Sequence, residues 1–256
     1  LPLRMHNYRI QNTFIMKNKP ATTKAKNIKS RVIAFSACSI FLSSCSLQSN
    51  VKNIAVDNSD AETQVYKHGD TVFYIGAISD EANKQLVSHI DKNTKTLKIS
   101  SRGGEIMLGM DLGDIIFANS LNVEVDEFCF SSCANYGFPA GKKKILNKNS
   151  MIGWHGGALQ KMVFDDSETE LAYKSYIEPA QKREAEYFRK IGVMQLSTIY
   201  GQRDEFKHFE KCAGWNYSKK AMAYFGMKNI ILPHDGWQPN TNFNGKCIFS
   251  IDDIKH

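Results

Sequence analysis

The sequence predicts an α/β domain with a mainly parallel sheet, and two features of the chain lead to this fold class. Short runs rich in β-branched and aromatic residues alternate with segments in which apolar residues recur at helical spacing. This alternation is typical of repeated strand–helix–strand units, whose crossovers place successive strands in parallel. In addition, 256 residues with 42% hydrophobic and 23% charged side chains are enough to bury a core of their own.

The predicted strands are short, and several of them end at a turn. Residues 71–76 place Val, Phe, Tyr and Ile side by side, which is the composition of a strand. The second strand runs into Gly103-Gly104, the third stops at residues 129–133, and the fifth ends at His155. In chain order, we expect strands at residues 71–76, 96–100, 123–128, 144–146, 150–155 and 230–232.

Helices are predicted between these strands by the spacing of apolar residues. Ser79 can cap the first helix, in which Ala82, Leu86 and Ile90 recur at helical spacing. Pro179 lies inside the longest helical pattern and is expected to disturb it. We expect helices at residues 79–90, 106–118, from about 133 onward and at 167–191, and an irregular extension after the last strand.

The first 44 residues have the layout of a secretory signal. They hold eight basic residues and no acidic one, and they end with an apolar run at 32–42. This run has about a dozen residues, whereas a membrane-spanning helix takes about 20. The formal charge of +7 belongs to this leader, because the rest of the chain carries 25 basic and 26 acidic residues. No basic stripe is interleaved with aromatic residues, so the sequence does not indicate a nucleic-acid partner.

Cys45 follows Ser43 and Ser44 in a pattern that resembles the bacterial lipobox. The resemblance implies cleavage before Cys45 and lipidation of that cysteine, and the following Ser46 implies an outer-membrane lipoprotein on the periplasmic face of the bacterial cell envelope. The alternatives are a cleaved signal without a lipid and a short membrane anchor. We therefore expect a signal peptide at 1–44, the lipidated cysteine with a flexible polar tether at 45–69, and one folded domain at 70–256.

Export changes what the four cysteines of the domain predict. In an oxidising compartment an even number of cysteines indicates disulfides, and four cysteines permit three pairings that the sequence cannot distinguish. One pairing joins Cys212 to Cys247, which would tie down the C-terminal tail, and leaves Cys129 with Cys133, which would brace the turn between them. A zinc site is the alternative, but the spacings fit no common ligand pattern.

Three segments at predicted strand ends carry residues suited to chemistry. Gly103-Gly104 allow a sharp turn whose free N–H could face an oxyanion, although an ordinary strand-to-helix turn explains the same residues. Ser131 and Ser132 precede a predicted helix, where a serine can act as a nucleophile or cap the helix. His155 stands near glycines at a strand end, where it could be a general base or have a structural role.

In order and spacing, these segments resemble the catalytic subunit of the Clp protease. The similar segments are residues 99–110 (glycine turn and helix), 130–141 (nucleophile segment), 150–155 (strand ending in the catalytic histidine) and 218–227 (a late helix). The resemblance covers roughly residues 70–232 and implies the Clp/crotonase spiral of stacked strand–helix units. The Cys-x-Ser-x-Cys form of residues 129–133 is also similar to exported Clp-like proteins of the wider crotonase superfamily.

The resemblance implies a role for each matching residue. Counting back from Ala140-Gly141 without an insertion makes Ser132 the nucleophile, whereas anchoring on the Cys-x-Ser-x-Cys form makes it Ser131, and we prefer Ser132. The other implied roles are the general base at His155 and an oxyanion hole at the N–H groups of Gly103 and Cys133.

The acid that orients the histidine in that family does not carry over. Gly214 and Trp215 stand at the matching place, so Asp204 is the candidate that we adopt. Further candidates are Asp165 and Asp166, and a Ser-His dyad supported by a backbone carbonyl is also possible.

The function expected from these residues is that of a serine peptidase or related acyl hydrolase, which needs no metal or other cofactor. Its substrate would be a peptide or an unfolded polypeptide. The alternative is a catalytically inactive envelope lipoprotein with a binding or scaffolding role, which the missing acid favours. Crotonase-like acyl-CoA chemistry is disfavoured by export. Other expected partners are the membrane, through the N-terminal lipid, and further copies of the chain, because relatives often assemble into rings or trimers.

Overall fold

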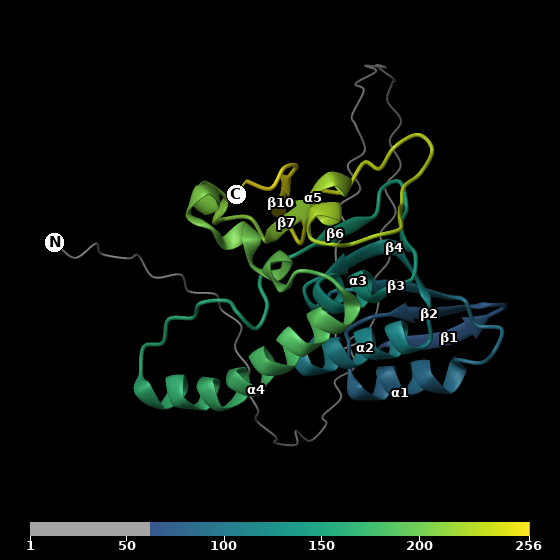
Figure 1. Ribbon diagram of the computed structural model, residues 1–256, viewed down its shortest axis with the longest axis horizontal. Helices are drawn as coiled ribbons and strands as arrows, with labels where there is room; N and C mark the ends of the chain where they lie inside the picture. The colour runs from purple at the N-terminus through teal and green to yellow at the C-terminus, as the bar shows by residue number, and fades with distance from the viewer. Residues whose placement is uncertain (1–61, 256) are drawn as a thin grey trace, which may run out of the picture. The chain divides into compact units, whose positions relative to one another are not determined.

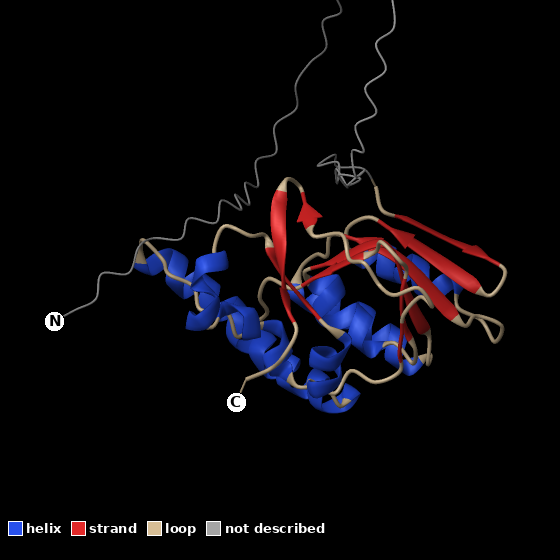
Figure 2. Cartoon of the chain, turned by 90° about the horizontal axis from the view of Figure 1, so that it is seen from above, coloured by secondary structure: helices blue, strands red, loops and turns tan. Residues whose placement is uncertain are grey.

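The structure, a computed structural model, describes residues 62–255 of the chain. The signal peptide, the lipidation site Cys45 and most of the tether therefore lie outside the described residues. The described part is a mixed α/β fold with a mostly parallel central sheet, which confirms the predicted fold class. Figure 2 shows the helices gathered largely on one side of this sheet.

Ten strands form two sheets in the described chain. The large sheet contains β1 (Gln64–His68), β2 (Thr71–Ile75), β3 (Thr96–Ser101), β4 (Asn122–Phe130), β5 (Lys144–Leu146), β6 (Met151–Gly153) and β8 (Ile230–Ile231). Its order is β1-β2-β3-β4-β5-β8, and β6 pairs with the last part of β4. All its pairs are parallel except β1 with β2. The second sheet contains β7 (Gly214–Tyr217), β10 (Lys246–Ile251) and β9 (Asn242–Phe243) in that order.

Helices follow the strands (Figure 1), and α1, α2 and α4 lie where the sequence pattern predicts helices, whereas the 3₁₀ helices at residues 195–209 were not predicted. They are α1 (Asp80–His89), α2 (Ile106–Ala118), the π-helix η1 (Cys133–Gly137), α3 (Phe138–Ala140), α4 (Ser167–Ile191), the 3₁₀ helices η2 (Gln195–Thr198), η3 (Tyr200–Gln202) and η4 (Asp204–Phe209), and α5 (Lys219–Tyr224). Ser79 caps α1 by accepting the N–H of Ala82 at 3.1 Å, as expected. The carboxylate of Glu105 caps α2 by accepting the N–H groups of Met107 and Leu108.

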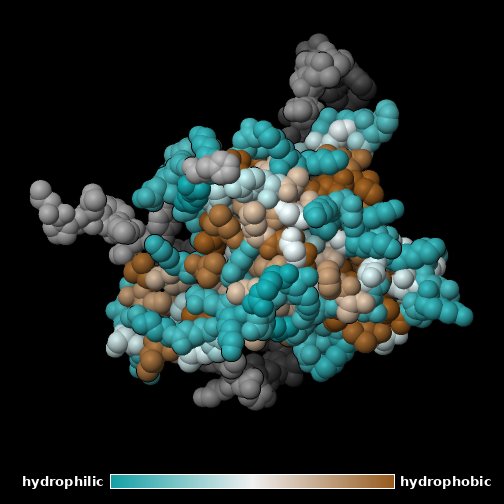
Figure 3. Space-filling model, in the orientation of Figure 1, coloured by the Kyte–Doolittle hydropathy of each residue, from teal (hydrophilic) through white to brown (hydrophobic). Residues whose placement is uncertain are grey.

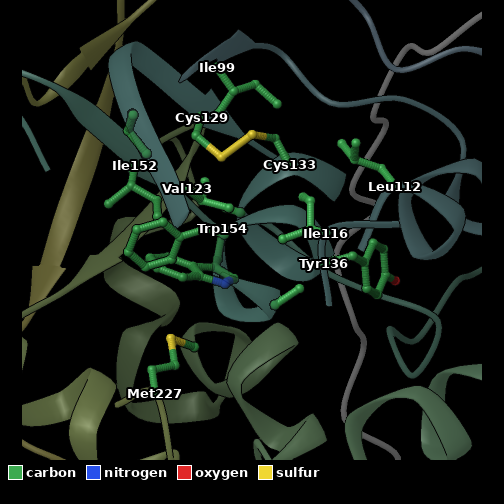
Figure 4. Close-up of a cluster of buried hydrophobic side chains, with 14 of the residues drawn as sticks. Ile99, Leu112, Ile116, Val123, Cys129, Cys133, Tyr136, Ile152, Trp154 and Met227 are labelled. Carbon is green, nitrogen blue, oxygen red and sulfur yellow. A yellow bond between two sulfur atoms is a disulfide. The ribbon is translucent and has the colours of Figure 1, made fainter. Parts of the chain in front are cut away.

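The core lies between the large sheet and α2. Figure 4 shows Ile99 and Val123 of the sheet together with Leu112 and Ile116 of α2, and each of these side chains is at most 1% exposed. Trp154 lies in the same cluster and is also fully buried. Burial of each such side chain stabilises the fold by about 1.5–3 kcal/mol, so this cluster fixes the strands whose ends carry the site.

Two disulfides join the four cysteines of the domain. Cys129 pairs with Cys133, and Cys212 pairs with Cys247, so the zinc alternative is wrong and one of the three possible pairings is selected. Disulfides persist in oxidising compartments, which indicates an exported protein in an extracellular or periplasmic setting. Among residues 62–255, no helix has both the length and the apolar character needed to cross a membrane. In Figure 3, hydrophobic side chains form patches separated by hydrophilic ones.

The structure corrects three details of the predicted organisation. The strand β1 lies within the range 45–69 expected to be a tether; it is an edge strand that pairs with β2, and Tyr66 stacks on Phe73. The extension after residue 232 contains the regular strand β10, which pairs with β7. Finally, α4 continues through Pro179 as one helix.

Candidate active site

Three adjacent parallel strands end at one edge of the large sheet. Ser101 at the end of β3 is opposite Cys129 of β4, and Phe130 at the end of β4 is opposite Gly153 at the end of β6. Because the carboxyl ends of parallel strands meet at the same edge, three segments come together there. They are the glycine turn at Gly103-Gly104, the serine turn at Ser131-Ser132 and the histidine loop that begins at His155. The resemblance of the three segments to the Clp protease subunit implied that they meet.

Ser131, not Ser132, lies against the histidine. The Ser131 Oγ is 2.7 Å from His155 Nε2, which is a hydrogen-bond distance. The Ser131 backbone adopts φ 59°, an uncommon conformation for a residue other than glycine, and its N–H donates to the Gly153 carbonyl at 3.0 Å. This sharp turn presents the hydroxyl in a partly exposed position at the sheet edge, as a nucleophile requires.

The preference for Ser132 is therefore corrected in favour of the alternative, Ser131. Ser132 is only 3% exposed, and its hydroxyl donates to the Gly104 carbonyl at 2.7 Å, which leaves it no contact with His155. The reason for the error is the π-helix η1, in which the Phe138 N–H donates to the Cys133 carbonyl five residues earlier. A π-turn holds one residue more than an α-turn, so counting back from Ala140-Gly141 without an insertion stops at Ser132, one position short of Ser131.

His155 occupies a largely apolar environment. The side chain is partly buried, and this burial lowers the pKa of the imidazole from its ordinary value of 6.5. The ring stacks on Phe130, with 5.1 Å between the ring centroids. Since a neutral imidazole is the form that accepts a proton, the lowered pKa favours a general base near neutral pH.

Within the described part of the chain, no carboxylate is hydrogen-bonded to the His155 ring as the acid of a triad would be. Asp204 is exposed and pairs with Lys207 at 2.8 Å, so this prediction is wrong. Asp166 instead caps α4 through the N–H of Thr169. The position that matches the family's acid is closed, because a Cβ on Gly214 would lie 2.1 Å from the Trp154 carbonyl oxygen. Among residues 62–255, the only recorded hydrogen bond of the His155 ring is the one to Ser131.

The glycine turn packs directly on the serine turn. Gly103 has φ 92°, and a Cβ there would lie 2.8 Å from both Ser131 Cβ and the Ser132 nitrogen, so only glycine allows this approach. The Gly103 N–H already donates to Ser101 Oγ at 3.1 Å, which contradicts its expected role as a free oxyanion donor. The Gly103 carbonyl accepts the N–H of Ile78. In a trans peptide the C=O and the N–H point in opposite directions, so the Gly104 N–H points away from Ile78.

If Ser131 is the nucleophile, the second expected oxyanion donor, the Cys133 N–H, must also be reassigned. The N–H that follows a nucleophile is the natural oxyanion donor, and here it belongs to Ser132 rather than Cys133. Cys133 instead closes the serine turn through its disulfide with Cys129.

Two residues that the sequence analysis missed connect the serine turn to the histidine loop. The side-chain amide of Asn135 donates to the Gly156 carbonyl at 2.6 Å, while the Asn135 N–H donates to the Ser131 carbonyl at 2.8 Å. Glu184 of α4 is fully buried and accepts both the Tyr136 hydroxyl, at 2.6 Å, and the Ala158 N–H, at 3.1 Å. Both side chains therefore hold the loop that carries His155 against the helix that follows Ser131.

A signal for Glu184 is present in the sequence. Glu184 follows Ala180 by four residues and precedes Tyr187 and Phe188 by three and four, so it lies on the apolar face of α4. A carboxylate on such a face is costly unless it is hydrogen-bonded, which marks it as a residue with a specific partner.

The Cys129–Cys133 disulfide leads to a prediction for stability and reactivity. Replacement of both cysteines by Ala is expected to lower the free energy of unfolding by at least about 2 kcal/mol, from the closed loop and the buried sulfur volume. It should also slow the reaction of Ser131 with an electrophile, because the turn is no longer closed. Urea unfolding and labelling rates check both effects. An unchanged labelling rate in a destabilised variant would show that the disulfide does not position the serine.

Comparisons with known proteins do not assign the chain to a family. No protein-family model matches the sequence, and no curated protein matches it. The resemblance to the Clp protease subunit therefore rests on the motif residues themselves.

Proposed function

We propose that the chain is a serine hydrolase, most closely a peptidase, that uses Ser131 and His155 as a catalytic dyad. The observation that carries this proposal is the 2.7 Å distance between Ser131 Oγ and His155 Nε2 at the edge of the sheet. A serine that only caps a helix has no need of an imidazole partner or of a left-handed backbone conformation. The same distance argues against the alternative of an inactive binding or scaffolding protein, in which the two side chains would have no reason to meet.

The proposed mechanism assigns one role to each of these groups. His155 accepts the proton of the Ser131 hydroxyl while Ser131 Oγ attacks the substrate carbonyl, and the tetrahedral oxyanion is held by the N–H groups of Ser132 and Gly104. When the intermediate collapses, the imidazolium gives its proton to the leaving amine and an acyl-enzyme remains. Water, activated by His155, then attacks the acyl-enzyme and releases the acid and free Ser131.

The choice of a peptide substrate rests on the resemblance to the Clp protease subunit. The parallel strands with crossover helices support the same spiral family, and the late helix α5 lies where that resemblance expects a helix. Acyl-CoA chemistry of the crotonase type is less compatible with the oxidising compartment that the disulfides indicate. We further propose that Cys45 anchors the protein by a lipid to the periplasmic face of the outer membrane, where short or unfolded polypeptides would be its substrates and the domain could self-associate.

A fluorophosphonate probe tests the proposed class of enzyme, because it reacts with an activated serine but not with an ordinary one. The wild-type protein with intact disulfides is expected to be labelled. His155→Ala should be labelled at least about 100-fold more slowly, since the hydroxyl loses its base. His208→Ala is the matched control, because His208 has no hydrogen bond to a serine among the described residues. Absence of labelling in the wild type, or equal rates in wild type and His155→Ala, would contradict the proposal.

A further inference from the structure

The imidazole of His155 lies at the end of a stack of aromatic rings. The Phe130 ring is 5.1 Å from the His155 ring, centroid to centroid, and the two planes differ by 9°. Phe130 also stacks with Phe243 at 4.3 Å, with planes 26° apart. Both phenylalanine side chains are 8% exposed, so the stack is fixed inside the protein rather than free at its surface.

The backbone of β4 and β6 creates this stack. Phe130 is opposite Gly153 in the parallel pair, and a Cβ on Gly153 would lie 2.6 Å from Phe130 Cδ2. The missing side chain of Gly153 therefore leaves the space that the Phe130 ring fills. His155 follows Gly153 by two residues, and residues two apart in an extended chain point to the same side. The imidazole is thus placed beside the Phe130 ring by the sheet itself.

The C-terminal strands hold the far end of the stack. Phe243 belongs to β9, which pairs with β10, and Cys247 of β10 is joined to Cys212 by the second disulfide. The Ala213 N–H donates to the Cys247 carbonyl at 2.8 Å, which fixes the same strand to the chain before β7. The second disulfide and its sheet therefore support Phe243, and through it Phe130.

We propose that Phe130, supported by Phe243, is a positioning residue that orients His155 in place of the carboxylate of a Ser-His-acid triad. In a triad the acid holds the imidazole at the correct angle to the serine. Here a side chain cannot occupy the position of that acid, because Gly214 lies against the Trp154 carbonyl. The side chain that packs against the imidazole is instead the buried Phe130 ring. This inference rests on the proposed dyad of Ser131 and His155.

Among residues 62–255, no hydrogen bond or ion pair joins a charged side chain to the His155 ring. Phe130 and Ser131 come from the end of β4, Gly214 from β7, and Gln202 of η3 donates to the His155 backbone carbonyl rather than to the ring. Burial is accordingly the cause that lowers the pKa of His155. Removal of the Phe130 ring should let water reach the imidazole and raise that pKa toward its ordinary value of 6.5.

The test uses the full chain with three variants and two readouts. Phe130→Leu replaces the flat ring with a smaller apolar side chain that leaves room for water beside the imidazole, Phe130→Tyr keeps the ring, and Phe128→Leu is the matched control. Phe128 lies on the same strand and contacts Phe243, yet it has no recorded contact with His155. The first readout is the pKa of His155 by NMR of ¹³C-histidine-labelled protein, with the signal assigned by its loss in His155→Ala. The second is the steady-state hydrolysis of an activated ester.

The expected result separates the variants. Phe130→Leu should raise the His155 pKa and lower kcat about tenfold with KM within about twofold, whereas Phe130→Tyr and Phe128→Leu should leave both near wild type. An unchanged His155 pKa in Phe130→Leu, or an equal shift in Phe128→Leu, would overturn the inference. If the wild type hydrolyses no ester while the pKa shift is specific to Phe130→Leu, the proposed hydrolase function fails but the positioning of the imidazole by Phe130 stands.

Discussion

Ser131→Ala is expected to reduce kcat/KM by at least about 10⁴-fold while the protein stays folded. The hydroxyl of Ser131 is the group that forms the covalent bond, and its removal leaves only binding and the oxyanion donors. The Ser131 side chain is partly exposed and its side-chain partner is His155, so its loss removes one hydrogen bond of a partly buried imidazole at the sheet edge and none inside the hydrophobic core. Steady-state kinetics on a peptide or ester substrate, together with a thermal unfolding curve, check this expectation.

Ser132→Ala is the matched control for the nucleophile. Ser132 is buried, and its hydroxyl donates to the Gly104 carbonyl at 2.7 Å, so its loss should cost about 1 kcal/mol of stability. The Ser132 N–H, which is the proposed oxyanion donor, remains in this variant. We therefore expect kcat/KM to change by less than about tenfold. The reverse order of effects, with Ser132→Ala inactive and Ser131→Ala active, would return the nucleophile to Ser132.

Glu184→Ala is expected to lower the free energy of unfolding by about 3 kcal/mol or more. The change leaves two buried donors, the Tyr136 hydroxyl and the Ala158 N–H, without a partner, and also the partly buried side-chain amide of Gln195. Burial, and then the nearby Glu184 carboxylate, raise the pKa of Tyr136, so this hydroxyl is protonated at neutral pH and donates. Activity should fall as well, because Ala158 lies three residues after His155 on the same loop. Urea unfolding and kinetics measure the two effects.

Two further variants make the Glu184 prediction specific. Glu184→Gln can still accept from Tyr136 and Ala158, but its amide then faces that of Gln195, so an intermediate loss is expected. Glu186→Ala removes an exposed carboxylate from the same helix and should change stability by less than about 0.5 kcal/mol. Equal effects of Glu184→Ala and Glu186→Ala would show that the buried carboxylate has no special role.

The order of strands and helices was predictable because local patterns and short crossovers determine it. The β-rich runs of β2 to β6 and the helical spacing of α1, α2 and α4 are visible in the sequence, and their α/β alternation implies a parallel sheet. The strand β1 was missed because it is a short edge strand of mixed polarity that depends on pairing with β2. The strand β10 was missed because its partner β7 lies about thirty residues away in the sequence, which local patterns do not reveal.

The sequence predicted which segments form the candidate site, but not which of two adjacent serines faces the histidine. Ser131, His155 and Gly103 stand at strand ends whose meeting follows from a parallel sheet. The choice between adjacent serines depends on the single additional residue of the π-helix η1, which counting back from Ala140-Gly141 does not reveal, although the Cys-x-Ser-x-Cys spacing pointed to Ser131. The sequence shows that glycine, not an acid, stands at position 214. It does not show that the backbone of Trp154 leaves no room for a side chain there, because that contact forms only in the folded protein.

The identity of the serine that a fluorophosphonate modifies is the most direct test of the Ser131–His155 dyad. After labelling of the intact disulfide-bonded protein, proteolysis and tandem mass spectrometry of the peptide that contains residues 129–133 would locate the adduct. We expect an adduct on Ser131, which lies 2.7 Å from His155 Nε2, and none on Ser132. An adduct on Ser132, or on a serine elsewhere in the chain with Ser131 unmodified, would contradict it.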